Sequence, residues 1–416
     1  MDVVFPRCCG LDVHKKSISA CIVIWGEGGR QKHEQRFGGY TQELDRLAEW
    51  LTEHEVTEVA MEATGVYWKP VWNVLEGQFG LLLVNPQHVK ALRGKKTDRV
   101  DAAHLADLLQ YGLLRSSFVP SREIRELRDL TRNRTRTVQE GVRITNRLQK
   151  VLEDANIKLA SVASDVVGVS GLRILEALVK GTTDAVKLAD LAVGKLRQKK
   201  APLEQALAGH VSDHHRRMLD KHLRALRTRQ AEIDEDEKDI RHKIAPFADA
   251  VKAWMQLPGV DEVTAWSLVA EMGPDMAPFA TADQAASWAC VCPGNDESAG
   301  KQGNGRTRKG NPWLRGALCE AAWGASRTKK SYFHAQYHRL CARRGPQRAL
   351  LAVAHSLLVV GFYLVKHNLQ YNELGADFFD RRNRERTKNR AVKRLTALGY
   401  KVTIEELPPV EVAVPA

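Results

Sequence analysis

The chain has 416 residues, which is too long for one compact core and predicts two or three domains. No apolar run reaches the roughly 20 residues that a membrane helix requires, and the first residues lack a charged leader followed by an apolar stretch, so we expect a cytoplasmic protein without a membrane partner. Lysine and arginine number 63 against 50 acidic residues, and this net charge of +13 favours a nucleic-acid partner. The seven cysteines form no CxxC pair, which predicts reduced thiols.

Residues 1–120 alternate short apolar runs with amphipathic stretches. The pattern predicts four strands, at residues 8–13, 17–25, 56–61 and 81–84. Helices are expected from Thr41 and over residues 67–75. Strands that first form a hairpin and later alternate with helices indicate an α/β domain, with a mixed sheet under helical cover.

Residues 121–250 are charged and helical in pattern. Apolar residues recur at helical spacing in both halves, with Val138 in the seam of the first half, and this predicts an antiparallel or dimeric coiled coil. Arginines recur three, four or seven residues apart on one helix face, which is either a solvated side of the coiled coil or a nucleic-acid contact. The arginines that we take as candidate nucleic-acid contacts are Arg122, Arg125, Arg132, Arg136 and Arg143.

Residues 251–375 are richer in glycine, proline and tryptophan and predict a mainly α domain that ends in an apolar helix. The turn at Gly259 is typical of a helix-hairpin-helix unit, whose backbone amides hold a phosphate, and a simple helical hairpin in the core is the equal alternative. Residues 376–416 form a basic tail that we expect to be partly disordered.

Four acidic residues stand out in the first domain. Asp12 lies among apolar residues inside the first strand, where an uncompensated carboxylate is costly, and Glu62 closes a later strand. Asp98 and Asp101 are three apart at the start of a helix and share one face. Taken singly, each is more often a solvated side chain or a helix N-terminal charge. Together they can converge, and four hard oxygen donors suit a pair of Mg²⁺ ions, with Mn²⁺ as an alternative.

The segments around these acids, GLDVHK, MEATGVYW and KTDRVDA, resemble the signature motifs of the DEDD, RuvC-like transposases of the insertion-sequence one-ten family. The resemblance implies an RNase H-like (RuvC-like) N-terminal domain. The residue pattern predicts the long helical coiled-coil middle and the mainly α C-terminal domain that follow it. It also assigns metal binding and catalysis to Asp12, Glu62, Asp98 and Asp101.

A glycine-rich, basic loop in the C-terminal domain contains Ser298 between small neighbours. The cations near it that can neutralise phosphates are Lys301, Arg306, Arg308 and Lys309. By composition this is a phosphate-binding loop, and a serine nucleophile needs activation that no spacing reveals. The same family has this block, and the resemblance implies that Ser298 is a catalytic serine that forms a covalent link to DNA.

The resemblance further implies three partners. They are DNA, as element ends and target; a structured noncoding guide RNA that pairs with both; and other copies of the chain, in a dimer or tetramer where the serine domain of one subunit completes the RuvC-like domain of another. The basic helix face after Ser121 suits a folded RNA backbone. These partners predict an enzyme of the bacterial cytoplasm that meets the nucleoid during transposition.

Two other classes remain open at this point. One is a junction-resolving nuclease or an ATP-dependent kinase with the same core fold, although GLDVHKKS is a poor match to the phosphate loops of such kinases. The other is a nucleic-acid-binding protein without catalytic activity, in which the four acids are structural. Metal-dependent strand transfer separates these classes.

Overall fold

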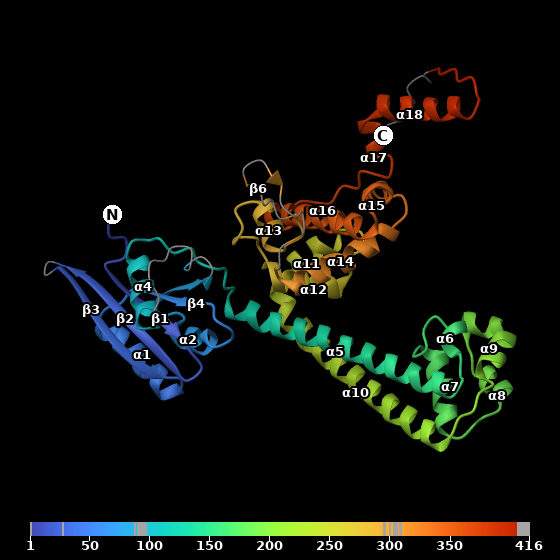
Figure 1. The fold of residues 1–416 in the computed structure, drawn as a ribbon, viewed down its shortest axis with the longest axis horizontal. Coiled ribbons are helices and arrows are strands. Elements are labelled where there is room, and N and C mark those ends of the chain that lie inside the picture. Colours follow the sequence, from blue (N-terminus) through green and yellow to red (C-terminus); the bar gives the residue numbers. More distant parts are fainter. Residues whose placement is uncertain are drawn as a thin grey trace. The chain divides into compact units, whose positions relative to one another are not determined.

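The computed structural model describes residues 2–26, 29–86, 89, 98–293, 297–298, 301–302, 307 and 310–405. Side chains are described for these residues except 98–100, 297–298 and 301–302. The chain divides into two compact units, Met1–Pro120 and Ser121–Ala416, and each is treated by itself (Figure 1).

A five-stranded mixed sheet forms the centre of the first unit, in the order β3-β2-β1-β4-β5. The strands are β1 (Arg7–Val13), β2 (Ser17–Gly26), β3 (Gly29–Gly38), β4 (Glu58–Glu62) and β5 (Gly80–Val84). β1, β2 and β3 are antiparallel neighbours, whereas β1, β4 and β5 run parallel. The sequence pattern did not predict β3, because this edge strand is polar and almost entirely exposed.

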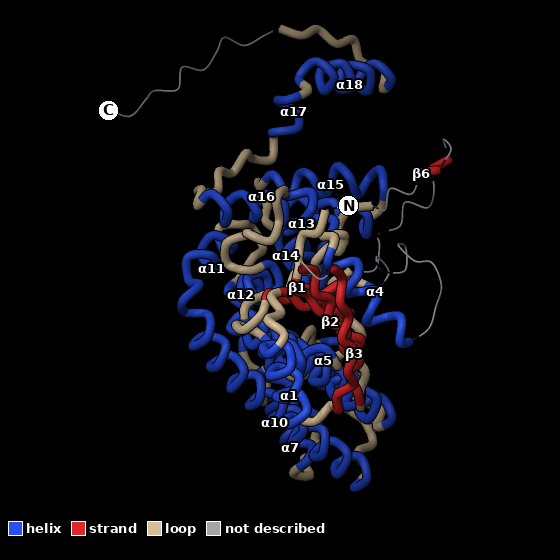
Figure 2. The backbone as a smooth tube through the Cα atoms, turned by 90° about the vertical axis from the view of Figure 1, so that its left-hand side faces the viewer, coloured by secondary structure: helices blue, strands red, loops and turns tan. Residues whose placement is uncertain are grey.

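Helices cover both faces of this sheet (Figures 1 and 2). One face packs on α1 (Thr41–Glu53) and α2 (Trp68–Leu75), as predicted from the apolar stripe of α1. The other face packs on α4 (Asp98–Gln110) through alanines and Leu109. Because alternate strand residues face opposite sides, Leu11 belongs to the α1 face and Cys8 to the α4 face.

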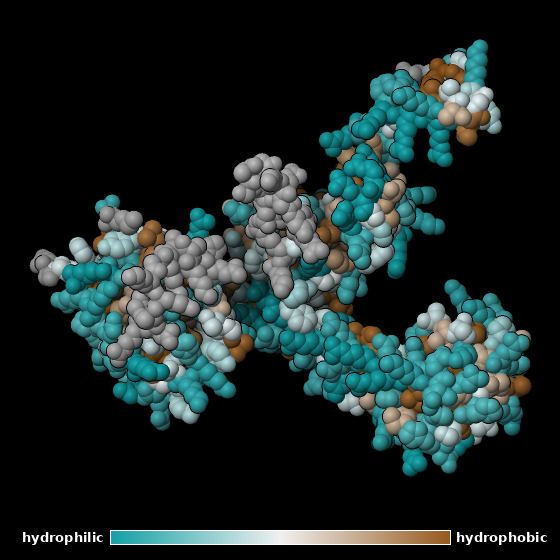
Figure 3. All heavy atoms as spheres, in the orientation of Figure 1, coloured by the Kyte–Doolittle hydropathy of each residue, from teal (hydrophilic) through white to brown (hydrophobic). Residues whose placement is uncertain are grey.

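Two long helices, α5 (Arg122–Asp154) and α10 (Asp213–Ile244), lie side by side and antiparallel in the second unit (Figure 1). Charged hydrogen bonds between the two helices fix their register: Lys243 donates to Glu126, and Arg229 donates to Glu140 at 3.0 Å. Most of the visible face of the pair is hydrophilic (Figure 3). Val138, expected in the seam, is 37% exposed; the buried positions on this helix include Thr131 and Thr137 instead.

A small helical cluster joins α5 to α10 at the far end of the pair. It comprises α6 (Leu159–Val162), α7 (Val169–Val179), α8 (Ala185–Asp190), the short 3-10 helix η1 (Gly194–Lys199) and α9 (Lys200–Leu207). Its core includes Leu148, Leu152, Leu219 and Leu223 from the two long helices. The pair therefore carries a folded cap with a hydrophobic core of its own.

The helices that follow share a second core, built around Trp254, Trp266, Phe333 and Phe362. They are η2 (Ala245–Phe247), α11 (Ala248–Met255), α12 (Glu262–Met272), α13 (Ala282–Trp288), α14 (Pro312–Arg327), α15 (Tyr332–Arg344) and α16 (Pro346–His367). A hairpin of two short strands, β6 (Glu297–Ser298) and β7 (Lys301–Gln302), lies between α13 and α14. Two further helices, α17 (Phe378–Arg382) and α18 (Arg384–Ala397), follow α16. Residues 406–416, where disorder was expected, lie outside the described chain.

Among the described helices, α16 is long and apolar enough to cross a membrane by length and composition alone. The sequence pattern predicts an apolar helix in this region but no run of membrane-spanning length. Eight of its residues are buried, and Val353, Leu357 and Phe362 belong to the same core as Trp254. We therefore assign α16 as the central core helix of this domain.

Candidate active site

Asp12 and Glu62 lie at the ends of neighbouring parallel strands. Leu11 pairs with Met61 in the register of β1 and β4, so Asp12 and Glu62 follow at the same level. Leu11 and Met61 both belong to the core on the α1 face. By the alternation of a strand, Asp12 and Glu62 are directed to the opposite face, which α4 covers.

α4 crosses this face antiparallel to β1, and three contacts follow the crossing. The amides of Val4 and Phe5 donate to Gln110, and the Cys8 thiol lies 3.6 Å from the carbonyl oxygen of Ala106. At Gly10 the helix backbone is so close that an added Cβ would lie 2.2 Å from the carbonyl oxygen of Ala102. Glycine is therefore required inside this strand.

The same progression extends to Asp12. Two strand residues advance about 6.6 Å, as far as roughly four residues of helix. Gly10 lies against the turn of α4 between Ala102 and Ala106, so Asp12 comes level with the first turn of α4, which begins at Asp98. Asp101 lies on the next turn and is half-buried.

α4 is held in this position at its other end by charge. Asp107 forms ion pairs with Arg30 and with Lys32, the latter at 2.9 Å, and both cations lie on β3. The polar residues of β3, which kept the sequence pattern from predicting this strand, thus connect the edge strand to α4. These pairs are about one-third exposed, so we expect them to contribute orientation more than stability.

Asp12 is mostly buried, with a side chain 15% exposed, and its carboxylate lies 3.1 Å from Nε2 of His14. Among the described side chains, no group of three or more histidines, cysteines or acids could hold a metal ion. The side chain of Asp98 is outside that description. The structure thus brings Asp12 and Glu62 level with each other and Asp12 level with the start of α4, and it shows no complete ligand set.

Ser298 lies in the β6–β7 hairpin, where it pairs with Lys301 across the strands. Nothing is described of these two side chains, and Arg306, Arg308 and Lys309 lie outside the described residues. The two ends of the loop that carries the hairpin meet. An added Cβ on Gly310 would lie 2.2 Å from the sulfur of Cys290, so the loop leaves and returns at one place on the helical domain.

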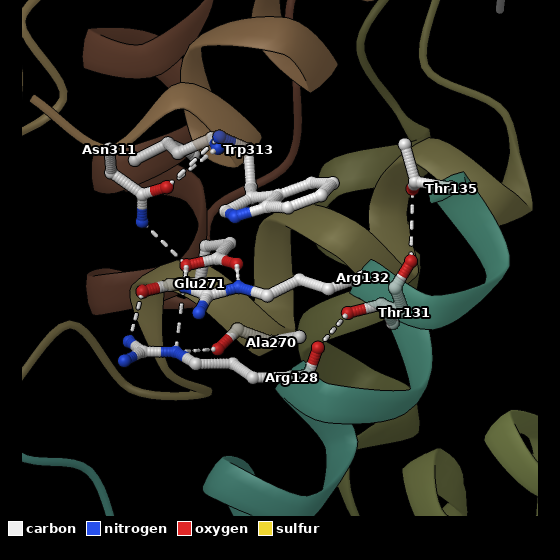
Figure 4. A network of polar contacts seen from close by, with 9 residues as sticks. Arg128, Thr131, Arg132, Thr135, Ala270, Glu271, Asn311 and Trp313 are labelled. Carbon is white, nitrogen blue, oxygen red and sulfur yellow. Dashed lines mark hydrogen bonds and ion pairs between the residues drawn. The ribbon is translucent and has the colours of Figure 1, made fainter. Parts of the chain in front are cut away.

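A buried charged network lies directly beside the returning end of this loop (Figure 4). Glu271, 1% exposed at the end of α12, accepts hydrogen bonds from Nε and Nη2 of Arg132 at 2.6 and 2.8 Å. The Asn311 amide donates to the same carboxylate at 2.5 Å. The Asn311 side-chain oxygen in turn caps α14 by accepting from the amides of Trp313 and Leu314.

Arg128 completes the network from one turn earlier on α5. Its guanidinium donates to the carbonyl oxygens of Ala270 and Glu271 at 2.7 and 2.6 Å. Burial lowers the pKa of Arg128 to about 10, so the side chain is still charged at neutral pH. The C-terminal carbonyls of α12 are thereby satisfied by a cation from another helix.

The structure divides the candidate arginines of α5 into two groups. Arg132 is bound to Glu271, and the Arg136 guanidinium lies 5.1 Å from the Trp313 ring centre. Arg122 pairs with Glu126 at the surface and Arg125 is half-buried, whereas Arg143 is exposed. Arg132 and Arg136 therefore have clear structural roles, which the sequence pattern did not separate from nucleic-acid contacts.

Gly259 also has a structural role. It has a φ of +82°, and an added Cβ would lie 2.2 Å from the amide nitrogen of Ala325 on α14. This close packing favours the simple helical hairpin between α11 and α12, while phosphate binding at Gly259 stays a prediction.

Glu271 was missed in the sequence, although a signal was present. It is the lone acid in the apolar stretch AWSLVAEM, and a carboxylate there needs compensation as much as Asp12 does. Its partners are more than a hundred residues upstream and forty downstream, so spacing could not identify them.

Comparison with known families covers both regions just described. A family described as "Transposase" matches residues 9–157, and the "Transposase IS116/IS110/IS902 family" matches residues 251–338. No curated protein matches the chain. The first match contains β1, β4 and α4 with their carboxylates, and the second contains Glu271, the Ser298 hairpin and α14. The chain belongs to the IS110 family of transposases.

Proposed function

We propose that this transposase cuts and rejoins DNA with two centres, a divalent-metal site at Asp12, Glu62, Asp98 and Asp101 and a nucleophilic serine, Ser298. The observation that carries the metal site is the crossing of α4 over Gly10, because it aligns the ends of β1 and β4 with the first turn of the helix. We also infer an RNase H-type fold for the first unit, supported by its mixed sheet with helices on both faces.

The four carboxylates match Mg²⁺ or Mn²⁺, which prefer hard oxygen ligands. A bound ion would supply Lewis-acid stabilisation of charge that develops on phosphate oxygens. Asp12 and Glu62, on a rigid sheet, would fix two ligand positions, while Asp98 and Asp101 would close the site from α4. His14 contacts the Asp12 carboxylate and would hold its orientation.

Ser298 would act together with the metal site in cutting and rejoining the DNA strands. Its hydroxyl oxygen would attack phosphorus and form an O–P bond as the bond from phosphorus to a sugar oxygen breaks, and the hydroxyl proton would pass through solvent to that leaving oxygen, which becomes a free hydroxyl. The covalent link conserves the phosphodiester for rejoining. The hairpin places Ser298 opposite Lys301, whose cation would favour the phosphate.

A guide RNA and a homo-oligomer complete the proposal. The exposed Arg143 and its neighbour Arg147 on α5 would contact RNA phosphates. The antiparallel pair α5–α10 would act as a coiled-coil arm, and the serine domain of one subunit would complete the metal domain of another. Two compact units within one chain are consistent with such an exchange.

Asp12→Asn tests the metal centre. The substitution removes the charge of a metal ligand but keeps the side-chain shape. Strand transfer with purified protein, RNA, DNA and Mg²⁺ should therefore fall at least about a hundredfold, because loss of a residue that merely supports a metal ligand already costs about tenfold to a hundredfold. Asp45→Asn, at an exposed position of α1, is the matched control and should transfer at the wild-type rate. Normal transfer by Asp12→Asn would exclude the metal site.

Ser298→Ala tests the second centre separately. The covalent protein–DNA species, detected as a shifted band after denaturation, should be absent in this variant. Ser164→Ala, at an exposed loop position, should retain it. A persistent adduct in Ser298→Ala would show that another residue is the nucleophile.

A further inference from the structure

A large pocket in the described part of the chain adjoins the serine loop. It has a volume of about 1290 Å³ and lies among α14, α15 and α16. Val291, Cys292 and Pro293, which lead into the loop, line it, and so does Thr307 near the end of the loop. The pocket is therefore next to the segment that carries Ser298.

Four arginines from three helices converge on this pocket. They are Arg315 on α14, Arg343 and Arg344 at the end of α15, and Arg348 at the start of α16. Within the described residues none of the four forms a salt bridge or a side-chain hydrogen bond, and no carboxylate lines the pocket. Four cations around one cavity, with no salt-bridge partner among the described residues, attract a polyanion.

The inner wall is polar and incompletely satisfied. Gln336 donates to the Ser356 hydroxyl at 2.8 Å, and that hydroxyl donates to the carbonyl oxygen of Ala352. The other amide atom of Gln336 and the Nδ1 of His355 are buried without a partner among the described residues. A buried polar atom without a hydrogen-bond partner is unfavourable, so both atoms favour a ligand or water that can bond to them.

The rest of the wall is apolar. Leu340, Leu350 and Leu351 line it together with Val291. The volume exceeds the roughly 300–1,000 Å³ of ordinary ligand pockets. The cavity thus offers space for one or two nucleotides, with apolar surface for a base, hydrogen-bonding groups for its edge, and cations for its phosphates.

We propose that this pocket binds an unpaired nucleotide of the DNA strand beside the Ser298 hairpin. The four arginines hold the backbone phosphates, and the base enters the cavity to meet Gln336 and His355. A duplex would contact only the arginines, because its base edges are already paired and cannot reach the inner wall. The choice of DNA rests on the proposed function.

Equilibrium binding tests the pocket without any chemistry. The protein carries Ser298→Ala, no divalent metal is added, and fluorescence anisotropy follows a labelled DNA hexamer. The same hexamer with a central abasic site, the matching duplex and the matching RNA are the comparison probes. Because cleavage is not measured, failure of the Ser298 mechanism cannot affect this result.

Arg343→Ala with Arg348→Ala removes two phosphate contacts. Affinity for the hexamer should fall at least about tenfold, and the dependence of log K on log salt should become shallower by about 0.7 for each lost contact. Arg173→Ala with Arg217→Ala removes two exposed arginines, which form no described salt bridge, from α7 and α10, and should leave affinity unchanged. Equal affinity of the pocket variant and wild type would overturn the proposal.

Gln336→Met tests recognition of the base. It keeps the side-chain length but removes the amide, so binding of the intact hexamer should weaken about threefold to tenfold while the abasic probe is unaffected. Wild type should prefer the intact DNA strand to the abasic, duplex and RNA probes. Equal binding of abasic or duplex DNA, or tighter binding of RNA, would show that the pocket does not hold an unpaired DNA nucleotide.

Discussion

The helix that carries two of the proposed metal ligands, α4, and the helix that follows the serine loop, α14, are held in the fold in opposite ways. α4 lies on β1 by direct backbone contact at Gly10, with buried cysteines and alanines around it. The start of α14 is held by a buried carboxylate, Glu271, through Asn311. One support depends on shape and the other on charge.

This difference predicts different sensitivities. A close-packed contact fails when one methyl group is added, because neither backbone can move independently. A buried ionic network tolerates small changes of shape but fails when one charge is removed, since its partners are left uncompensated. Substitutions that separate size from charge therefore distinguish the two supports.

The largest expected effect is at Glu271. Glu271→Ala leaves Arg132 and Arg128 without their carboxylate, so the free energy of unfolding of the second unit should fall by about 3–5 kcal/mol. Urea denaturation measures this loss. Glu262→Ala on the same helix is the control, because its carboxylate is half-exposed and pairs with Arg241 only at 3.5 Å.

Hydrogen exchange localises the same effect. Amides at the start of α14 should exchange faster in Glu271→Ala, because Asn311 loses the carboxylate that positions its cap. Glu271→Gln keeps the shape and one acceptor and should lose less stability than Glu271→Ala. Equal stability of Glu271→Ala and Glu262→Ala would refute the charge-based support.

Gly10→Ala should have the next largest effect. The new methyl group would meet the backbone of Ala102 and Ala106, and overpacking of this kind costs about 1–3 kcal/mol. Because α4 must move away from β1, strand transfer should fall more than DNA binding does. Gly26→Ala, where an added Cβ meets nothing within 4 Å, should change neither stability nor transfer.

Local periodicity predicted much of the fold. The helix α1 from Thr41, the helix α2 and the apolar helix α16 were all predicted from the sequence. β3 was not, because an edge strand with polar side chains on both faces has no alternating pattern. Its role emerges only from the pairing of Arg30 and Lys32 with Asp107.

The candidate site was less predictable than the fold. The motifs identified the acids, but their alignment depends on where α4 crosses β1, and in the sequence Gly10 is only an unfavourable residue for a strand. The basic pocket is harder still. Arg315 and Arg348 come from different helices, and no local pattern brings them to one cavity.

The thiols beneath α4 give a third, pH-dependent test. Burial raises the pKa of Cys8 to about 12 and that of Cys21 to about 11, from an ordinary value of 9.0. The thiols therefore ionise first in the unfolded chain, so the contribution of these two thiols to stability is constant below pH 9 and falls as pH rises from 9 towards these values. The expected loss is about 1.4 kcal/mol per pH unit for each thiol.

Urea denaturation at pH 8 and pH 10 measures this dependence. Cys8→Ala removes one of the ionising groups, so its stability should fall less between the two pH values than that of wild type. Identical pH dependence in Cys8→Ala and wild type would mean that the Cys8 thiol is not protected by its contact with α4.

The smallest effect should come from the exposed ion pairs of α5, the helix that also carries Arg128 and Arg132 of the buried network. Arg229 and Glu140 join α10 to α5 at 3.0 Å, but their side chains are 31% and 50% exposed. Exposed pairs contribute about 0.2–1 kcal/mol, because water competes for both charges. A double-mutant cycle with Arg229→Ala and Glu140→Ala should therefore give a coupling below about 1 kcal/mol, several times smaller than the loss at Glu271. A coupling as large as the loss in Glu271→Ala would mean that the stability of the α5–α10 pair depends on its surface charges. Burial would then not be the property that distinguishes the Glu271 network from an exposed ion pair.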